Sequence, residues 1–197
     1  MTASIKSLCV YCGAAEGRGP AYRDIAQRLG RHIAQNDVRL IYGGGRVGLM
    51  GVVADAVKSA GGQVTGVIPN FLEIREIGNR EIDELRVVDS MHARKQLMFE
   101  LSDGFCMMPG GFGTLEEAVE IITLKQLQQH RKAVVILNAH GFYDPLHTLF
   151  EHFYEQHFAK PASRALYHFA PTVEDTFEYL DTYKPVSVPT KWFEVGK

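Results

Sequence analysis

Three short apolar runs in this chain each end at a glycine turn that leads into a helix-forming stretch. The runs are Ser7–Cys12, Val38–Tyr42 and the residues just before Pro109. Parallel strands are joined by crossover connections, which are usually helices. The carboxyl ends of parallel strands meet at one edge of a sheet, where such folds bind ligands. The three turns are therefore expected to bring several backbone donors together at that edge.

The rest of the chain continues the alternation of strand and helix. Strand patterns fall at 5–12, 38–43, 63–68, 85–88, 104–108 and 133–138, and helical patterns fall at 20–35, 46–60, 90–102, 114–130 and 143–158. This order predicts an α/β fold, a doubly wound parallel sheet with helices on both faces. We expect one domain over residues 1–183, whose last helix is capped near Thr172, followed by an extended tail over 184–197. The least regular stretch is Pro69–Glu84.

Composition argues against several classes of partner. The chain has 197 residues with 21 Lys and Arg against 23 Asp and Glu, a net charge of −2, so nothing indicates a nucleic-acid or membrane-surface patch. No apolar run approaches the roughly 18 residues of a membrane span. The first residues also lack a secretory core. We therefore expect a cytoplasmic protein that binds neither nucleic acid nor membrane.

The cysteines and histidines do not have the spacing of a redox or metal site. Cys9 and Cys12 resemble a redox pair, but residues three apart in a strand face opposite sides of the sheet. His147, His152 and His157 recur every five residues, which turns each about 140° from the last on a helix. With no complete pyridoxal or NAD fingerprint either, we expect neither a metal nor a cofactor.

The segment from Pro109 to Glu117 has the composition of an anion site with a carboxylate beside it. Its three glycines let backbone N–H groups approach a phosphate, and the helix that follows supplies unpaired N–H groups and the positive end of its dipole. Two explanations of Glu117 stay open. Thr114 and Glu117 fit a capping box, in which the acid only caps its own helix. Alternatively, the carboxylate acts on a bound ligand.

A second glycine loop follows the strand at 38–43. Gly43, Gly45 and Gly48 satisfy the pattern G-x-G-x-x-G. A dinucleotide site also needs an acid at the end of the next strand, roughly 20 residues on, to hold the ribose hydroxyls. That strand ends at Ile68 and is followed by proline and asparagine. The loop therefore predicts a nucleotide ligand other than NAD.

Two cations fall beside the apolar stripe of the helix expected at 90–102. Arg94 is three, four and seven residues from apolar side chains, and Lys95 has similar neighbours. One explanation is that their aliphatic stems cover apolar surface while the charged heads reach water. The other is a role in binding, because this helix immediately precedes the strand that delivers the Pro109 loop.

Three ordered motifs resemble those of the LONELY GUY family, the cytokinin riboside 5'-monophosphate phosphoribohydrolases. They are Gly43-Gly-Gly-x-x-Gly-Leu-Met-Gly51, Met91-His-x-Arg-Lys95 and Pro109-Gly-Gly-x-Gly-Thr-x-x-Glu117. The resemblance implies a Rossmann-like fold and a homodimer. It also implies hydrolysis of the N-glycosidic bond of an adenine-type nucleoside 5'-monophosphate, either cytokinin riboside monophosphate or AMP, to the free base and ribose 5-phosphate.

The resemblance further implies roles for individual residues. Arg94 and Glu117 match the catalytic pair of the family. The substrate-binding positions implied by the motifs and glycine turns are Gly13, Gly43, Gly44, Glu76, Arg94, Lys95, Gly110, Gly111, Gly113, Thr114, Glu117 and Thr123. One departure is that Ala14 and Ala15 replace serines that are common in the family, which removes any hydroxyl contact from the first loop.

The chemistry of the implied reaction suits these residues. Breaking a ribosyl–adenine bond builds oxocarbenium character on the sugar, which the Glu117 carboxylate can stabilise or capture. Arg94 would position the phosphate and orient Glu117. The alternative is a nucleotide- or cofactor-binding carrier on the same fold, which would use the glycine loops without turnover. A pyridoxal-dependent lysine decarboxylase fits less well, because no lysine has a recognisable Schiff-base setting.

Overall fold

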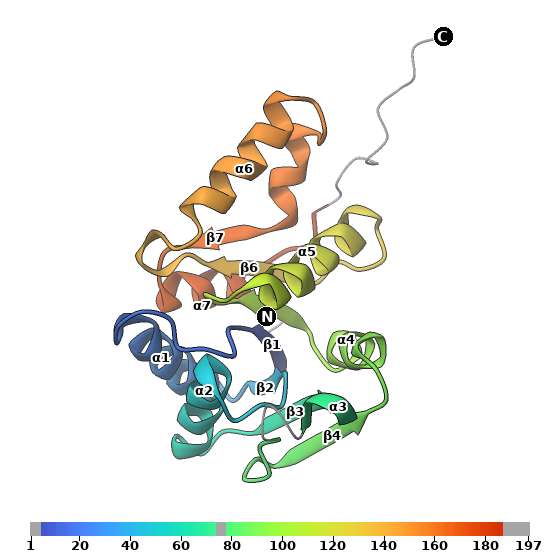
Figure 1. Cartoon of the computed structure of the whole chain (residues 1–197). Helices are drawn as coiled ribbons and strands as arrows, with labels where there is room; N and C mark the ends of the chain where they lie inside the picture. The colour runs from blue at the N-terminus through green and yellow to red at the C-terminus, as the bar shows by residue number, and fades with distance from the viewer. Residues whose placement is uncertain (1–4, 74–77, 187–197) are drawn as a thin grey trace.

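The structure is a computed structural model that describes residues 5–73 and 78–186. Its centre is one seven-stranded sheet in which neighbouring strands are parallel (Figure 1). The strands are β1 (Ser7–Tyr11), β2 (Arg39–Tyr42), β3 (Val64–Pro69), β4 (Glu84–Val88), β5 (Gly104–Met107), β6 (Ala133–Leu137) and β7 (His168–Ala170). Their order in the sheet is β4-β3-β2-β1-β5-β6-β7. The predicted doubly wound parallel sheet is confirmed.

The strand order reverses its direction between β1 and β5. Strands β2 to β4 extend the sheet on one side of β1, and strands β5 to β7 extend it on the other. Val10 pairs with Cys106 and Tyr11 with Met107, so β1 and β5 end side by side. In open α/β sheets the ligand crevice forms at this switch point, outside the carboxyl ends of the strands.

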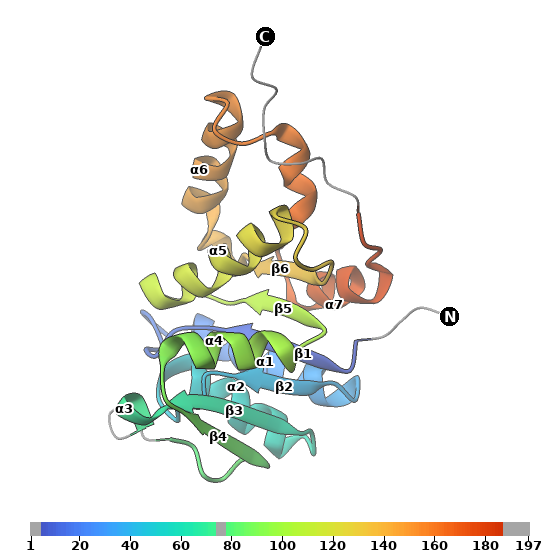
Figure 2. The same cartoon turned by 90° about the vertical axis from the view of Figure 1, so that its right-hand side faces the viewer.

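Helices cover both faces of the sheet (Figure 2). They are α1 (Ala21–Gln35), α2 (Gly48–Ser59), α3 (Asn70–Glu73), α4 (Met91–Glu100), α5 (Phe112–Gln126), α6 (Asp144–Glu155) and α7 (Val173–Thr182), with 3-10 turns at Ala139–Gly141 and Pro161–Leu166. One core cluster joins Leu29 of α1 and Val53 of α2 to Phe177 of α7. A second cluster joins Met98 of α4 to Ile121 of α5. These clusters lie on opposite faces, which accounts for strands that are apolar throughout.

The two cysteines of the first strand region confirm this two-sided burial. Cys9 packs in the cluster of α4 and α5, whereas Cys12 packs in the cluster of α1 and α2. Both are free thiols. The prediction that they face opposite sides of the sheet is confirmed, and they cannot form a redox pair in this fold.

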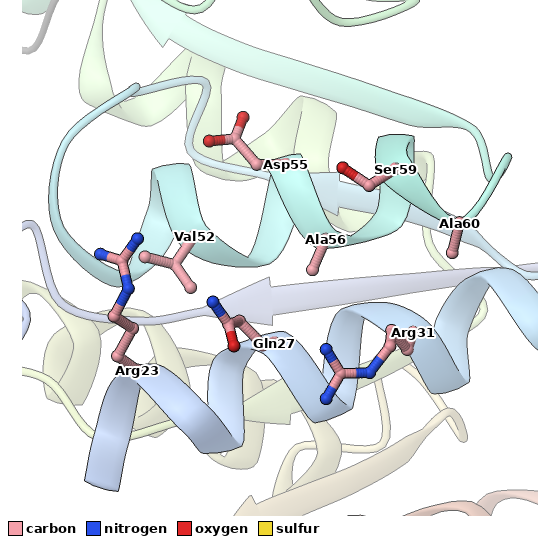
Figure 3. Close-up of a pocket in the computed structure, with 8 residues that line it drawn as sticks. All are labelled: Arg23, Gln27, Arg31, Val52, Asp55, Ala56, Ser59 and Ala60. Atoms are coloured by element: carbon pink, nitrogen blue, oxygen red, sulfur yellow. The ribbon is translucent and has the colours of Figure 1, made fainter. Parts of the chain in front are cut away.

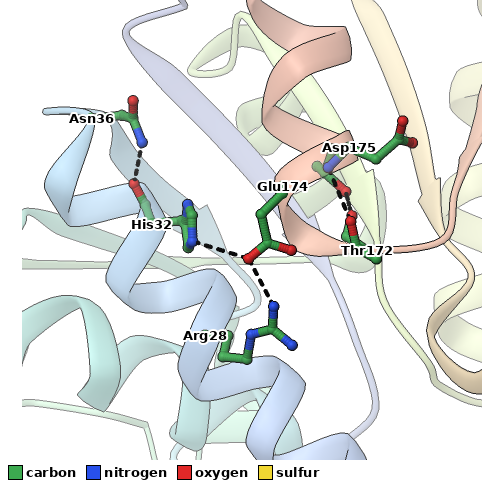
Figure 4. Close-up of polar contacts among 7 residues, drawn as sticks. Arg28, His32, Asn36, Thr172, Glu174 and Asp175 are labelled. Atoms are coloured by element: carbon green, nitrogen blue, oxygen red, sulfur yellow. Dashed lines mark hydrogen bonds and ion pairs between the residues drawn. The ribbon is translucent and has the colours of Figure 1, made fainter.

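The last helix begins at the predicted cap. The Thr172 hydroxyl accepts a hydrogen bond from the Asp175 N–H at 3.1 Å, and Arg28 of α1 pairs with Glu174 at 2.7 Å (Figure 4). The Arg28 pair is solvent-exposed, and such pairs contribute little to stability. The buried Phe177 instead supplies apolar contact with the core.

Three local details differ from the sequence-based expectations. Strand β7 is not among the strands expected from the sequence, and helix α3 lies in the stretch expected to be irregular. Helix α5 begins at Phe112, two residues before the expected start. The expected tail over 184–197 falls outside the described residues from position 187 onward, so the domain boundary stays a prediction. Within the described residues, the helices fall short of the length and apolar character that a membrane span needs.

Candidate active site

A cleft of about 310 Å³ opens at the carboxyl ends of β1 and β5, where the sheet order reverses. It combines the turns after β1, β2 and β5 with the first turns of α4 and α5. Its lining residues are Val10, Tyr11, Cys12, Gly13, Ala14, Gly43, Met50, Leu72, Met91, Arg94, Met98, Gly111, Gly113, Thr114, Glu116 and Glu117. The three glycine turns therefore meet at one site.

Arg94 is built into the wall of the cleft. Helix α4 is capped by Ser90, whose hydroxyl accepts from the Ala93 N–H at 3.1 Å, and Arg94 follows in the first turn. The side chain is buried, and its Nη2 donates to the Gly43 carbonyl at 3.1 Å. A Cβ at position 43 would lie 1.9 Å from Nη2. Glycine at 43 is therefore what lets the guanidinium approach the second glycine loop.

The Arg94 guanidinium has unused donor capacity. Its Nε is buried and has no hydrogen-bond partner among the described residues. A guanidinium carries five N–H donors, and burying donors without partners costs free energy. An aliphatic stem that covers apolar surface does not explain a buried guanidinium. A purely structural hydrogen bond to Gly43 leaves the Nε donor without a partner in the described part of the chain. A cationic donor set of this kind is suited to an anionic ligand group in the cleft.

The capping-box explanation of Glu117 is wrong. The N-cap of α5 is Gly111, and the helix begins at Phe112. Thr114 is consequently the third helical residue rather than the cap, and it is buried against the cleft. The glycine-rich turn allows the helix to start early, which leaves its first N–H groups beside the cleft. Glu117 lies one turn further on, 8 % exposed, and lines the same cleft.

The charges of Glu117 and Arg94 both affect the pKa of Cys12, the residue that follows β1. Burial raises the pKa of the Cys12 thiol, the Glu117 carboxylate raises it further, and Arg94 lowers it. The cation and the carboxylate thus share one low-dielectric region, in which electrostatic interactions are stronger than in water. With its pKa raised, Cys12 remains a thiol and is a poor nucleophile.

Lys95 holds the first turns of α4 and α5 together rather than lining the cleft. Its ammonium group pairs with Glu116 and, at 3.0 Å, with Glu120. The Glu116 carboxylate beside it raises the pKa of Lys95. Two acids of α5 are therefore offset by one cation. Glu117 lines the cleft together with Arg94.

The glycines after β5 divide into two kinds. A Cβ at Gly110 would lie 2.2 Å from Thr114 Oγ1, so this glycine is required by packing. A Cβ at Gly111 or Gly113 would meet no atom of the described residues within 4 Å, and neither has a positive φ. The protein's own structure therefore does not require glycine at 111 or 113. Both positions border the open cleft.

Four of the expected binding residues are not in the lining of the cleft. Gly44 lies behind it, with its carbonyl accepting from the Asn79 N–H at 2.9 Å, while Gly110 and Lys95 have the contacts described above. Thr123 is exposed on α5, nine residues beyond Thr114, which is about 13 Å along the helix axis. Glu76 lies outside the described residues.

The cleft also contains apolar residues that sequence reasoning missed. Tyr11, Met50, Leu72 and Met91 contribute to its walls, and the Met91 sulfur lies 3.8 Å from Arg94 Nη1. Tyr11 could have been found, because it is the last residue of a strand that ends at the crevice. The others lie in α2, α3 and α4, and their place in the cleft depends on how these helices pack, which no local pattern in the sequence indicates.

A second groove lies between α1 and α2, away from these residues. Its volume is about 280 Å³, and Arg23, Gln27 and Arg31 face Val52, Asp55 and their helix neighbours across it (Figure 3). Arg23 is already paired with Glu16 at 2.7 Å. None of the residues that line this groove belongs to the predicted site.

This chain is similar to known proteins over most of its length. The profile of a family described as "Possible lysine decarboxylase" matches residues 50–180. The protein named cytokinin riboside 5'-monophosphate phosphoribohydrolase LOG7, from Arabidopsis thaliana, is 40% identical over 196 residues, covering 98% of this chain and 90% of its own length. The LOG protein of Oryza sativa subsp. japonica, of the same enzyme name, is 42% identical over 180 residues, covering 91% and 74%.

Among solved structures, the molybdenum cofactor carrier protein of Chlamydomonas reinhardtii superposes with a TM-score of 0.67. It is 22% identical, and the match covers 88% of this chain and 94% of that one. At this level of identity the likeness shows the fold alone.

Proposed function

Because this chain belongs to the LONELY GUY family of cytokinin riboside 5'-monophosphate phosphoribohydrolases, we propose that it hydrolyses adenine-type nucleoside 5'-monophosphates. Water cleaves the N-glycosidic bond, and the products are the free base and ribose 5-phosphate. Cytokinin riboside monophosphate and AMP are the proposed substrates. The described residues that line the cleft include no lysine, which gives no support to Schiff-base chemistry of the decarboxylase type.

The observation that carries this proposal is the pair of open glycines beside a buried cation and a carboxylate. Gly111 and Gly113 are not required by packing, yet they border the cleft at the start of α5. Backbone N–H groups at a helix N-terminus are suited to a phosphate. A phosphate held there would place the ribose nearer to Glu117, and Arg94 would reach the phosphate from the opposite wall.

The proposed mechanism assigns separate tasks to the two charged residues. As the glycosidic bond breaks, the ribose becomes oxocarbenium-like, and Glu117 stabilises or captures that positive charge. Arg94 positions the phosphate and orients Glu117. It does not supply the proton that the departing base acquires, because a guanidinium hardly deprotonates near neutral pH. Water then adds its hydroxyl to the sugar carbon, releasing Glu117 where a covalent bond had formed, and the remaining proton of that water balances the one that the base acquires.

The first test compares substrates with and without the phosphate. Free base is separated by chromatography after incubation with AMP, with isopentenyl-AMP and with the corresponding nucleosides. We expect release from monophosphates alone, because the glycine turns and Arg94 would have no phosphate to bind in a nucleoside. Equal turnover of a nucleoside and its monophosphate would contradict the assigned role of the loops.

The second test removes the carboxylate while retaining its shape. Glu117→Gln should lower turnover by about 100-fold or more, roughly 3 kcal/mol of barrier, while the melting temperature barely changes. Arg94→Ala should act similarly, with part of its effect on KM. Glu120→Gln is the matched control, because it removes a carboxylate of the same helix that pairs with Lys95 but does not line the cleft. We expect the control to retain most activity.

The alternative function is a nucleotide- or cofactor-binding carrier on the same fold. A carrier would bind the monophosphate and release no base. A folded Glu117→Gln protein whose turnover equals that of an active wild type would instead return this residue to a structural role and leave the hydrolase proposal without its carboxylate. The fold likeness to the molybdenum cofactor carrier protein does not distinguish the two functions, because it shows the fold alone.

We also propose that the chain forms a homodimer through α5. Phe112, Val119 and Leu127 are 94%, 38% and 40% exposed, and with Thr123 they fall on one stripe of the helix. A second copy that covers this stripe would bury exposed apolar surface. Val119→Glu should convert the dimer to a monomer in sedimentation equilibrium, and a wild-type monomer would refute the proposal.

A further inference from the structure

Strand β5 leaves the sheet through Met108, whose backbone is fixed at both of its polar groups. The Met108 N–H donates to the Tyr11 carbonyl at 2.8 Å. The Met108 carbonyl accepts from the hydroxyl of Tyr143 at 2.7 Å, in a buried hydrogen bond. Pairing of β5 with β6 ends at Met107, one residue earlier. A side chain thus supplies the donor for this carbonyl just where the strand ends.

The geometry of this peptide sets the direction of the glycine turn. The residue before a proline is restricted to extended conformations, and Pro109 itself has a fixed φ and no N–H. The Pro109 carbonyl accepts from the Gly13 N–H at 3.1 Å, which ties the turn to the first loop. The fixed φ of Pro109 and the packing of Gly110 against Thr114 restrict the turn, so the orientation of the Met108 carbonyl affects the N–H groups that follow.

Tyr143 is itself held firmly by the turn between β6 and α6. Its N–H donates to the Asn138 side-chain oxygen at 2.7 Å, and the Asn138 amide donates to Asp144 at 2.7 Å. The Asn138 N–H donates to the carbonyl of Ala170 at 2.7 Å. His140 in this turn has a φ of 54°, a conformation that non-glycine residues rarely adopt. The phenol therefore projects from a turn anchored to the neighbouring strand β7.

We propose that Tyr143 is a positioning residue of the phosphate-binding turn. Its hydroxyl fixes the Met108 carbonyl and, through Pro109, the N–H groups around Gly111 and Gly113. Tyr143 is not among the residues that line the cleft, so it acts through the turn rather than by touching the ligand. A small displacement of positioned donors is enough to weaken binding strongly. This inference rests on the phosphate site of the proposed function.

The test uses two tyrosines that lose the same atom. Tyr143→Phe removes the hydroxyl that bonds Met108. Tyr154→Phe is the matched control, because Tyr154 is 6% exposed against 5% for Tyr143, lies in α6, and bonds its hydroxyl to Tyr167. Each variant keeps its ring and loses one hydrogen bond of its hydroxyl, which is buried for Tyr143 and part-buried for Tyr154. Both should therefore lower the melting temperature by a similar, small amount.

The readout is calorimetric binding of ribose 5-phosphate and, separately, of adenine. Tyr143→Phe should weaken ribose 5-phosphate binding by about tenfold and leave adenine binding unchanged, whereas Tyr154→Phe should change neither. In turnover of the monophosphate, Tyr143→Phe should raise KM more than it lowers kcat. Wild-type affinity for ribose 5-phosphate in Tyr143→Phe would overturn the inference, as would equal weakening by both variants.

Binding of ribose 5-phosphate does not require turnover, so the two proposals fail separately. A wild-type protein that binds ribose 5-phosphate but releases no base overturns the hydrolase proposal, while the ratio of affinities still decides the role of Tyr143. Should Tyr143→Phe not fold, Asn138→Ala loosens the turn and leaves the hydroxyl in place. Weaker ribose 5-phosphate binding with unchanged adenine binding in that variant supports the inference, and unchanged binding of both overturns it.

Discussion

Two glycine loops of similar composition border the same cleft, yet their glycines meet different demands. In the loop Gly43–Gly51, the protein's own atoms require glycine. Gly48 has a φ of 61°, and a Cβ there would lie 2.2 Å from the backbone carbon of Ala14. A Cβ at Gly51 would lie 2.0 Å from the Arg46 carbonyl oxygen. The backbone of this loop, which follows β2, packs directly against the loop that follows β1.

The loop after β5 has the opposite character at two of its three glycines. Gly111 and Gly113 face open space in the described structure, whereas Gly110 packs against Thr114. Glycine in a folded chain costs conformational entropy, so an open position with ordinary backbone angles calls for another explanation. Under the proposed function, that explanation is access of the phosphate to the backbone. The comparison thus distinguishes glycines that packing requires from glycines that packing does not require, a distinction that the sequence pattern alone does not show.

The largest predicted effect is on folding, from Gly48→Ala. The added Cβ collides with backbone that cannot move freely, and the residue must also adopt a left-handed conformation. We expect the free energy of unfolding to fall by about 4 kcal/mol and the melting temperature by about 10 °C. Gly61→Ala is the control, because Gly61 also has a positive φ, 81°, but faces open space. Equal losses in both variants would show that the collision with Ala14 is unimportant.

The next effect is on catalysis, from Gly43→Ala. The new methyl group would occupy the space of Arg94 Nη2 and displace the guanidinium from the Gly43 carbonyl. We expect kcat/KM to fall about 100-fold, similar to Arg94→Ala. The double variant should be little worse than either single one, because both remove the same interaction. Additive losses in that cycle would mean that Gly43 acts independently of Arg94.

The smallest effect is on binding, from Gly113→Ala. Gly113 is the second residue of α5, where alanine is the better helix former, so the melting temperature should stay constant or rise slightly. The methyl group would project into the cleft, and KM for the monophosphate should rise about tenfold. Thermal unfolding and steady-state kinetics measure the two quantities. A lowered melting temperature together with an unchanged KM would reverse the contrast between the loops.

The sequence predicted the sheet and the meeting of the glycine turns well, because both follow from the alternation of strands and helices. It missed β7, since His168–Ala170 is too short to show a strand pattern. It also misassigned Thr114 as a cap. The first residue of α5 depends on the backbone path through Gly111, and the letters of a capping box do not record that path.

Contacts between distant segments explain the rest of what sequence reasoning missed. Gly43 and Arg94 are 51 positions apart, and only the folded sheet brings the guanidinium to that carbonyl. The resemblance to the family implies that Lys95 contacts the nucleotide, and this stays a prediction. In the described structure its side chain, one residue further around the helix than Arg94, reaches Glu116 and Glu120 on α5. Adjacent residues on a helix do not share a direction, and the partner helix decides what each one meets.

The three buried thiols give this protein a built-in probe of how it opens. Cys9 and Cys106 are fully buried at the centre of the sheet, and burial raises the pKa of Cys106 to about 12. A thiol reagent can reach them only when the sheet opens, so their labelling rate measures the unfolding equilibrium under native conditions. Cys12 also lines the cleft, and its raised pKa makes it a slowly reacting thiol, so its labelling measures local opening at the site and is slowed further by an occupying ligand. One reaction time course thus follows global unfolding and local site occupancy in the same molecule.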